Sequence, residues 1–235
     1  MTATSFRPGQ RFDTEDNRWV AAKEFMGTQR VALGPVASHS WLHQPEHLAF
    51  QLSRYRAAAA LIGNAETVIE LGAGEGIGAG ILAKGRTYYC GVDNDGEAVM
   101  IARQTYAERP AVAFAELDVV DGRWMPGTLY DAVVSLDVIE HIPAERERAF
   151  IENAGALIPD HGVLVIGTPS KNAEHLASPQ SKAGHINTYT PERLRALMQR
   201  YFYVVQMAYM QDTAIHFGHP EMAHYVLAVG IGVRT

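Results

Sequence analysis

The sequence has one cysteine among its 235 residues, and it lacks long apolar runs. A single cysteine, Cys90, excludes a disulfide within the chain and a zinc site built on a CxxC pair. Cys90 stands in the apolar run TYYCGVD, where we expect a small buried side chain on a strand. No apolar run approaches the ~20 residues that a membrane-spanning helix needs, and the polar N-terminus has no apolar signal core. We therefore expect a cytoplasmic protein without a membrane part.

An excess of positive charge is also missing. The chain carries 20 Lys and Arg against 26 Asp and Glu, a formal net charge of −6. Such a surface repels a phosphate backbone, which argues against nucleic acid as the partner and favours a small molecule. The length fits one large α/β domain better than two full domains. Whether the chain forms a homodimer is left open by the sequence.

From residue 67 onward, short β-rich runs alternate with helix-like stretches. Strands are expected at 67–71, 87–92, 111–117, 130–136 and 163–167, and helices at 78–84, 96–108, 143–157 and 191–200. This alternation predicts an α/β fold, in which helices cover both faces of a mostly parallel sheet. Two further β-rich runs, 202–210 and 223–233, have no helix between them, so we expect them to pair antiparallel.

The region before the first strand has a different character. Trp19 to Met26 predicts a short helix, and Gly34 and Pro35 are interpreted as breaks. Apolar residues from Leu48 to Ile62 recur near the 3.6-residue period and predict a second helix. We divide the chain into an N-terminal helical segment at 1–64, expected to cover the substrate, and a main domain at 65–235.

The most informative stretch is a buried strand that runs into a glycine-rich turn, Glu70-Leu71-Gly72-Ala73-Gly74-Glu75-Gly76-Ile77-Gly78. Glycines permit positive φ and let a ligand approach the backbone without a Cβ in the way. The helix that follows offers free N–H groups. By itself such a unit is a weak signal, because it serves dinucleotides as well as other adenosine ligands.

Acidic residues follow at the ends of the next two strands. Asp93, with Asn94 beside it, lies about 20 residues after the glycines, where a carboxylate suits the hydroxyls of a ribose. The alternative is that Asp93 only caps the helix that starts near residue 96. Asp118, beside Val119, is placed to accept a hydrogen bond from an adenine amino group, and its alternative is an ordinary loop aspartate.

Leu136 and Asp137 end the fourth strand, at the edge where open α/β sheets bind ligands. Together the four strand ends resemble the class I S-adenosylmethionine-dependent methyltransferases over roughly residues 66–200. The resemblance implies a doubly wound, mostly parallel seven-stranded sheet whose last strand is antiparallel. It also implies contacts to S-adenosyl-L-methionine, with the acid ahead of the glycines on the methionine ammonium, from Glu70, Gly72, Ala73, Gly74, Asp93, Asn94, Asp118, Val119, Leu136 and Asp137.

A nucleotide-dependent dehydrogenase is the main rival for this fold. Glu70, on the strand just before the glycines, would repel a diphosphate but attract an ammonium group. The glycine spacing from Gly72 also fails the strict GxGxxG pattern. Both features favour the sulfonium cofactor. A non-catalytic protein on the same fold is a further alternative, against which the intact glycine turn and Asp93 argue.

The acceptor is expected to be a small molecule, methylated most plausibly at oxygen, with nitrogen or carbon as alternatives. Removing a hydroxyl proton needs a base, and we name His141 and His185, with Asp137 beside them, as catalytic candidates. A structural role is the alternative for each histidine. Trp41, His43, Tyr55 and the histidine-rich segment 212–225 are expected to flank the acceptor, although helix packing is the favoured role for Trp41 and Tyr55.

Asp137, Glu140, His141 and His185 also form a candidate site for a divalent ion such as Mg²⁺, Mn²⁺ or Fe²⁺. The pattern resembles the acid-x-x-Glu-His plus distant His of small-RNA 3′-end 2′-O-methyltransferases and of ubiquinone-pathway O-methyltransferases. The RNA enzymes have a glutamate where this chain has Asp137. A metal-dependent RNA 2′-O-methyltransferase is thus an alternative function. The favoured interpretation is metal-free, with these residues forming a wall of the substrate pocket.

Overall fold

A computed structural model describes residues 15–26, 31–121 and 127–234. The chain divides into two compact units, Met1–Ala32 and Leu33–Thr235. The first unit contains α1 (Glu15–Met26), which includes the short helix predicted from Trp19. None of the described helices combines the length and the apolar character that crossing a membrane requires.

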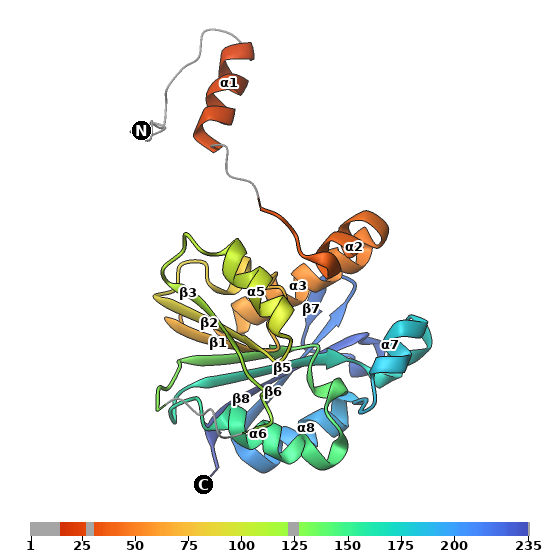
Figure 1. The fold of residues 1–235 in the computed structure, drawn as a ribbon. Helices are drawn as coiled ribbons and strands as arrows, with labels where there is room; N and C mark the ends of the chain where they lie inside the picture. The colour runs from red at the N-terminus through yellow and green to blue at the C-terminus, as the bar shows by residue number, and fades with distance from the viewer. Residues whose placement is uncertain (1–14, 27–30, 122–126, 235) are drawn as a thin grey trace. The chain divides into compact units, whose positions relative to one another are not determined.

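The second unit is built on one eight-stranded sheet with the order β3-β2-β1-β4-β5-β8-β6-β7 (Figure 1). Neighbouring strands from β3 to β5 are parallel, whereas β8 runs antiparallel to both β5 and β6. The strands are β1 (Thr67–Leu71), β2 (Tyr88–Asp93), β3 (Val112–Glu116), β4 (Ala132–Leu136), β5 (Val163–Pro169), β6 (Phe202–Gln211), β7 (Ala214–His216) and β8 (Tyr225–Val233).

The predicted α/β class and the antiparallel pairing of the last two long strands are confirmed. The sheet has eight strands instead of seven because β7, which lies in the histidine-rich segment, adds a short antiparallel edge to β6. Gln211 pairs with Ala214 across a two-residue turn in which Asp212 has φ +50°. The turn sequence is Asp-Thr, without the glycine that usually marks such a hairpin. The sequence pattern therefore does not predict this strand.

Helices cover both faces of the sheet, as two separate apolar clusters show. One cluster joins the sheet to α6 (Glu147–Gly155) and α8 (Pro191–Tyr201), with Phe150 and Leu194 fully buried. The other joins the opposite face to α3 (Pro45–Leu61), α4 (Ala79–Leu82) and α5 (Gly96–Thr105). The two helix layers are visible on either side of the strands in Figure 1. Cys90 lies on β2 as predicted, half-buried against the first cluster.

Two regions contain helices that the sequence reading did not predict. Pro35 is the first residue of α2 (Pro35–His43), where a proline is well tolerated because the N–H that it lacks would have no partner within the helix. It therefore begins a helix instead of breaking one. The second region holds a 3₁₀ turn at Lys171–Leu176 followed by α7 (Pro179–Gly184). Prediction and structure also differ at 143–157, where the 3₁₀ turn Ala144–Arg146 precedes α6.

The predicted boundary near residue 64 does not coincide with the division between the compact units. Both α2 and α3 belong to the same unit as the sheet. Tyr55 and Ala58 of α3 are buried in the sheet's second apolar cluster, so this helix is part of the core. A covering role for residues 1–64 stays a prediction.

Candidate functional site

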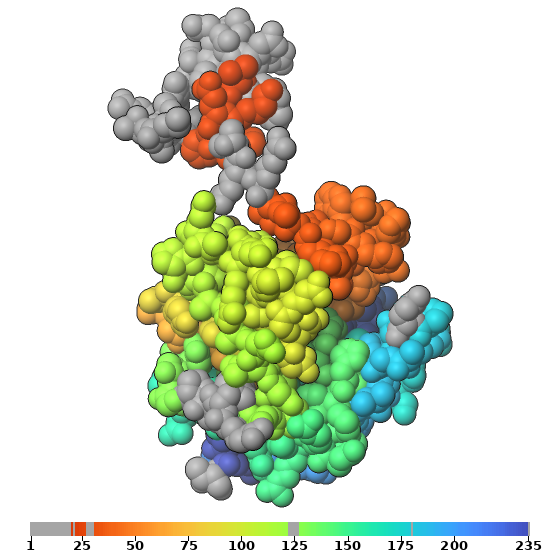
Figure 2. Space-filling view, viewed as in Figure 1, coloured from red at the N-terminus to blue at the C-terminus, as the bar shows by residue number. Residues whose placement is uncertain are grey.

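A cavity of about 440 Å³ opens where the carboxyl ends of β1, β2 and β4 meet α2, α3 and α5. Figure 2 shows α2 (orange) lying against the surface formed by α5 (yellow-green). Six of the predicted cofactor residues line this cavity: Gly72, Ala73, Gly74, Asp93, Leu136 and Asp137. The sequence reading missed the contribution of α5, whose Ala98 and Ile101 form part of the wall.

The glycine turn is held in shape by its backbone. Gly72, Gly74 and Gly76 all have positive φ, which most other residues adopt only with strain. The N–H groups of Gly72 and Ala73 donate to the carbonyl of Val92 at 2.8 and 2.9 Å, which fastens the turn to β2. A Cβ on Gly72 would lie 2.2 Å from Val138, whereas a Cβ on Gly74 would meet nothing within 4 Å. The turn is thus tightly packed at Gly72 and open at Gly74.

Asp93 ends β2 beside this opening. Its Oδ2 accepts a hydrogen bond of 2.7 Å from the Gly74 N–H, and its Oδ1 accepts one of 3.0 Å from the Asp95 N–H. The N-cap of α5 is Asp95, whose carboxylate accepts from the N–H groups of Glu97 and Ala98. Capping of α5 therefore does not account for Asp93, and its contact with a ribose stays a prediction.

Four other predicted cofactor residues lie outside the residues that line the cavity: Glu70, Asn94, Asp118 and Val119. Glu70 is fully buried, and the Tyr89 hydroxyl donates to its Oε2. Burial raises the pKa of Glu70 to about 7, against the opposing effect of the Tyr89 and Tyr55 hydroxyls. Asp118 accepts from the Val120 N–H and faces Arg146 at 3.6 Å. Contacts of Glu70 with an ammonium and of Asp118 with adenine stay predictions.

Glu75 of the glycine turn connects the turn to α2. Its carboxylate accepts hydrogen bonds from the N–H groups of Val36 and Ala37, at 2.9 and 3.0 Å. N–H groups in the first turn of a helix have no partner within the helix, and they attract negative charge. A Cβ on Gly34 would lie 2.3 Å from Cδ of Glu75, so the approach is close. The first turn of α2 is in this way fastened over one side of the cavity.

Asp137 follows β4 and has the unusual φ of +58°. Nη1 of Arg54, from α3, lies 2.9 Å from both carboxylate oxygens of Asp137. The same guanidinium stacks over the Tyr225 ring, with Cζ 4.2 Å from the ring centroid. Only 11% of the Arg54 side chain and 29% of the Asp137 side chain are exposed. Nothing in the sequence pattern singled out Arg54, because its partner is 83 residues away.

Three of the four predicted metal ligands come together. One potential ligand atom from each of Glu140, His141 and His185 lies within 4.8 Å of the other two. Asp137 is not part of this group, because its carboxylate is bound by Arg54. The Thr168 hydroxyl donates to Oε2 of Glu140 at 2.9 Å, and Oε1 is buried with no hydrogen-bond partner among the described residues. The three side chains therefore offer a compact set of oxygen and nitrogen donors.

Protonation in this group is set by burial and by neighbouring charge. Burial, and then the charge of Asp137, raises the pKa of Glu140 to about 8. Burial, and then the neighbouring His141, lowers the pKa of His185. The two imidazole rings meet edge to face, with centroids 5.1 Å apart. Nδ1 of His141 lies 2.9 Å from the carbonyl of Gly184, which can only accept, so Nδ1 is the donor in this hydrogen bond.

Two histidines, the exposed His47 and the half-buried His224, lie near Arg54. His47 of α3 was not noticed in the sequence; burial, and then the charge of Arg54, lowers the pKa of His47. The same two causes lower the pKa of His224, whose Nδ1 accepts from the Asp212 N–H. By contrast, Trp41 and His43 are exposed on α2, and Tyr55 is a buried core residue that also lines the cavity.

Similarity to known proteins agrees with this geometry. Residues 41–206, more than two thirds of the chain, match the family model of a methyltransferase domain. Two relatives from Mycobacterium tuberculosis, each named a probable S-adenosylmethionine-dependent methyltransferase, are 30% identical over 107 residues. The aligned part is 46% of this chain and spans 37% of the length of those relatives.

Among solved structures, the methyltransferase domain of bacterial CtHen1 has a TM-score of 0.65 at 20% identity, covering 78% of this chain and 99% of that domain. The N-methyltransferase NodS from Bradyrhizobium japonicum, solved with S-adenosyl-L-homocysteine, has a TM-score of 0.58 at 17% identity, covering 79% and 86%. These likenesses show a shared fold. With the family match and the glycine turn, they establish that the chain belongs to the class I S-adenosylmethionine-dependent methyltransferases.

Proposed function

We propose that the chain transfers the methyl group of S-adenosyl-L-methionine to an oxygen atom of a small-molecule acceptor. The observation that carries this proposal is the position of Asp137. It lines the cavity at the glycine turn, and its charge also helps to raise the pKa of Glu140 in the histidine group. A cofactor cavity and the group of Glu140, His141 and His185 thus adjoin at one edge of the sheet.

The residues of the cavity suit such a cofactor. Asp93 is a carboxylate at the cavity wall, and Gly74 leaves the backbone open beside it. The cofactor would supply an activated methyl group on a sulfonium, which becomes neutral when the methyl group leaves. In this proposal Asp93 binds the ribose, the glycine turn lies along the amino-acid part, and Asp137 borders the methionine end and the acceptor.

On the acceptor side, the two histidines are candidates for the base. The lowered pKa of His185 keeps its ring neutral near pH 7. Nδ1 of His141 donates to the Gly184 carbonyl, which leaves Nε2 as the ring nitrogen that would face an acceptor. We propose that one of these rings takes the proton from an acceptor hydroxyl, a contribution typically of about 10²–10⁴ in rate. An amine or carbon acceptor would meet the same two histidines, but the proton to be removed would come from nitrogen or carbon instead of oxygen.

A small and partly apolar acceptor is supported by the side chains that the nearby loops expose. Leu176, Ile186, Phe217 and Met222 are large apolar residues that are more than half exposed. They belong to the segments 171–176, 185–190 and 217–222, which lie after β5, before α8 and before β8. The net charge of −6 argues against an RNA acceptor. The cytoplasmic location and a homodimer stay predictions.

A metal-assisted reaction is the second candidate, and the compact group of Glu140, His141 and His185 favours it. The donors suit Mg²⁺, Mn²⁺ or Fe²⁺, and the buried Oε1 of Glu140 has no hydrogen-bond partner among the described residues. In this reading the ion would lower the pKa of the acceptor hydroxyl. The residues themselves would hold the ion and orient the acceptor, with Asp137 kept aside by Arg54.

Thermal unfolding with candidate cofactors tests the first part of the proposal. S-adenosyl-L-methionine and S-adenosyl-L-homocysteine should raise the unfolding temperature, because a ligand that binds the folded state stabilises it by mass action. NAD and NADP should leave the temperature unchanged. A shift with NAD and none with either S-adenosyl compound would refute the assignment of the cavity.

Metal removal separates the two mechanisms. If His141 or His185 acts as the base without an ion, EDTA should leave methyl transfer unchanged. His185→Ala should then lower turnover by ~10²–10⁴. If an ion is required, EDTA should abolish transfer, and Mn²⁺ or Mg²⁺ should restore it. Elemental analysis of wild type and His185→Ala, each purified without added metal and with S-adenosyl-L-homocysteine bound, provides an independent readout. His161→Ala, an exposed histidine just before β5 and outside the group, is the matched control.

A further inference from the structure

The loop that carries His185 is fastened on both sides of this residue. The preceding residue, Gly184, presents its carbonyl to Nδ1 of His141 at 2.9 Å. Two residues after His185, the Asn187 N–H donates to the Glu140 carbonyl at 3.0 Å. Both connections lead to the 3₁₀ turn Ile139–His141, which supplies the other two members of the histidine group. The place of His185 therefore depends on how firmly this loop is held.

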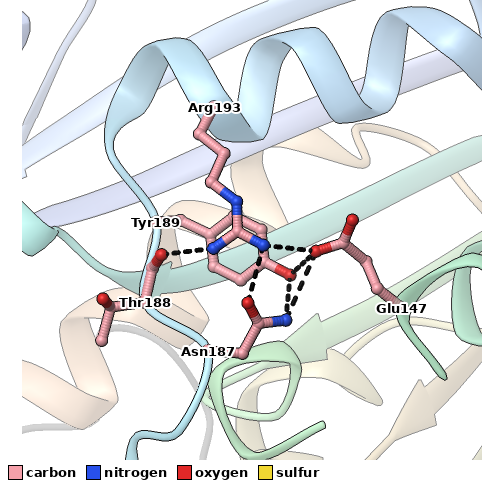
Figure 3. Close-up of polar contacts among 5 residues, drawn as sticks. All are labelled: Glu147, Asn187, Thr188, Tyr189 and Arg193. Carbon is pink, nitrogen blue, oxygen red and sulfur yellow. Dashed lines mark hydrogen bonds and ion pairs between the residues drawn. The ribbon is translucent and has the colours of Figure 1, made fainter. Parts of the chain in front are cut away.

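Arg193, near the start of α8, also binds this loop (Figure 3). Its guanidinium donates to the Thr188 carbonyl at 2.6 Å, to Oδ1 of Asn187 at 2.6 Å and to Oε2 of Glu147 at 2.8 Å. Glu147 begins α6. One cation in this way joins the loop to two helices that are separate in the sequence.

Tyr189 completes the network beneath the guanidinium. The centroid of its ring lies 4.1 Å from Cζ of Arg193, and its hydroxyl donates to Oε2 of Glu147. Nδ2 of Asn187 donates to the Tyr189 oxygen at 2.7 Å. Burial, and then the hydrogen bond to Glu147, raises the pKa of Tyr189, so the phenol keeps the proton that it donates.

Most of the network's polar groups are buried, so their hydrogen bonds constrain the positions of the side chains. Tyr189 is fully buried, Asn187 is 5% exposed, and 15% of the Glu147 side chain is exposed. A buried polar group that loses its partner carries a desolvation penalty, so these groups favour the single arrangement that satisfies them all. Loss of Arg193 would leave Asn187 Oδ1 and the Thr188 carbonyl without a donor.

We propose that Arg193 and Glu147 are positioning residues for the acceptor site. They hold the loop 185–190 so that the His185 ring meets Glu140 and His141. This inference rests on the proposed function, because it assumes that this histidine group faces the acceptor. Neither residue is a catalytic residue; each acts through the loop.

Nuclear magnetic resonance of the full-length protein, with isotope-labelled histidine, EDTA and S-adenosyl-L-homocysteine, tests the proposal. Wild-type protein should show a nuclear Overhauser effect between the ring protons of His141 and His185, since the ring centroids are 5.1 Å apart. Arg193→Ala should reduce this signal by at least half. Glu147→Gln should reduce it less, because the amide keeps an oxygen that can accept. Arg195→Ala, an exposed arginine on the same helix, should leave it unchanged.

Affinity for S-adenosyl-L-homocysteine, measured by calorimetry on the same samples, distinguishes positioning from general damage. It should stay within twofold of wild type in Arg193→Ala, because the cavity residues are elsewhere. An undiminished ring-to-ring signal in Arg193→Ala would overturn the proposal. If that variant does not fold, Arg193→Lys decides: lysine keeps the charge but lacks the planar fork, so the signal should still fall, and an unchanged signal would refute positioning. Failure of the wild-type protein to bind S-adenosyl-L-homocysteine would instead count against the proposed function. The signal between the His141 and His185 rings would still test whether Arg193 positions the loop.

Discussion

The two halves of the site are assembled in different ways. The cofactor half centres on residues 70–95, which form a strand, a turn and the next parallel strand. Asp93 accepts a hydrogen bond from the Gly74 N–H within this stretch. The acceptor half collects Arg54 from α3, Glu140 from the turn after β4, Thr168 from β5 and His185 from the loop before α8. The first half has a local motif at its centre, to which α2, α3 and β4 add part of the cavity wall, whereas the second half depends on long-range packing throughout. Substitutions should therefore affect the two halves differently.

The largest effect is expected at Asp93, in the cofactor half. Replacement by alanine removes charge-assisted hydrogen bonds to the ribose, each worth ~1.5–3 kcal/mol, and also the acceptor of the Gly74 N–H. Affinity for S-adenosyl-L-homocysteine should fall at least tenfold by calorimetry. Asp160→Ala, an exposed aspartate away from the cavity, serves as the control. Unchanged binding in Asp93→Ala would place the ribose elsewhere.

Arg54→Met should have a smaller effect, mainly on stability. Methionine fills much of the space but leaves Asp137 without its cation, and the half-buried pair should contribute about 1–3 kcal/mol, between exposed and buried ion pairs. Urea unfolding measures this loss, with Arg56→Met, an exposed neighbour on α3, as the control. The contrast between the two halves breaks down if Arg54→Met weakens binding of S-adenosyl-L-homocysteine as much as Asp93→Ala does.

A third effect is expected in the pH dependence of stability, where one buried carboxyl group in each half contributes. The folded-state pKa is raised to about 7 for Glu70 and to about 8 for Glu140. The folded protein therefore holds protons that the unfolded chain releases near pH 4.5. The resulting stability is complete below that pH and is lost as the pH rises through 7 and 8, by at most ~1.4 kcal/mol per pH unit for each group.

Two variants assign this loss to the two halves. Glu70→Gln should flatten the decline up to about pH 7, and Glu140→Gln should flatten the part that continues to about pH 8. Urea unfolding in EDTA at intervals from pH 5 to 9 measures both slopes. The lowered pKa values of His47, His185 and His224 act in the opposite direction at lower pH, so each variant is compared with wild type at the same pH. Parallel curves for wild type and Glu140→Gln would contradict the raised pKa.

The elements and site residues that the sequence predicts are those that depend on short-range patterns or on neighbouring strands. The alternation of strands and helices was predictable because each element has its own periodicity and turn residues. The glycine turn and Asp93 were predictable because adjacent parallel strands bring their carboxyl ends to one edge. The sequence pattern does not reveal β7 and α2, because the Asp-Thr turn lacks glycine and Pro35 can mark either a break or the first position of a helix.

The sequence by itself determined the α/β class, the family and the position of the cofactor turn, because these depend on patterns within a few dozen residues. The tertiary structure alone decided the partners of the acidic groups: it directed Asp137 to Arg54, Glu70 to Tyr89, and Glu75 to the first turn of α2. A carboxylate binds whichever donor the fold brings near it. That choice depends on how helices pack against the sheet, and the spacing of residues along the chain does not encode it.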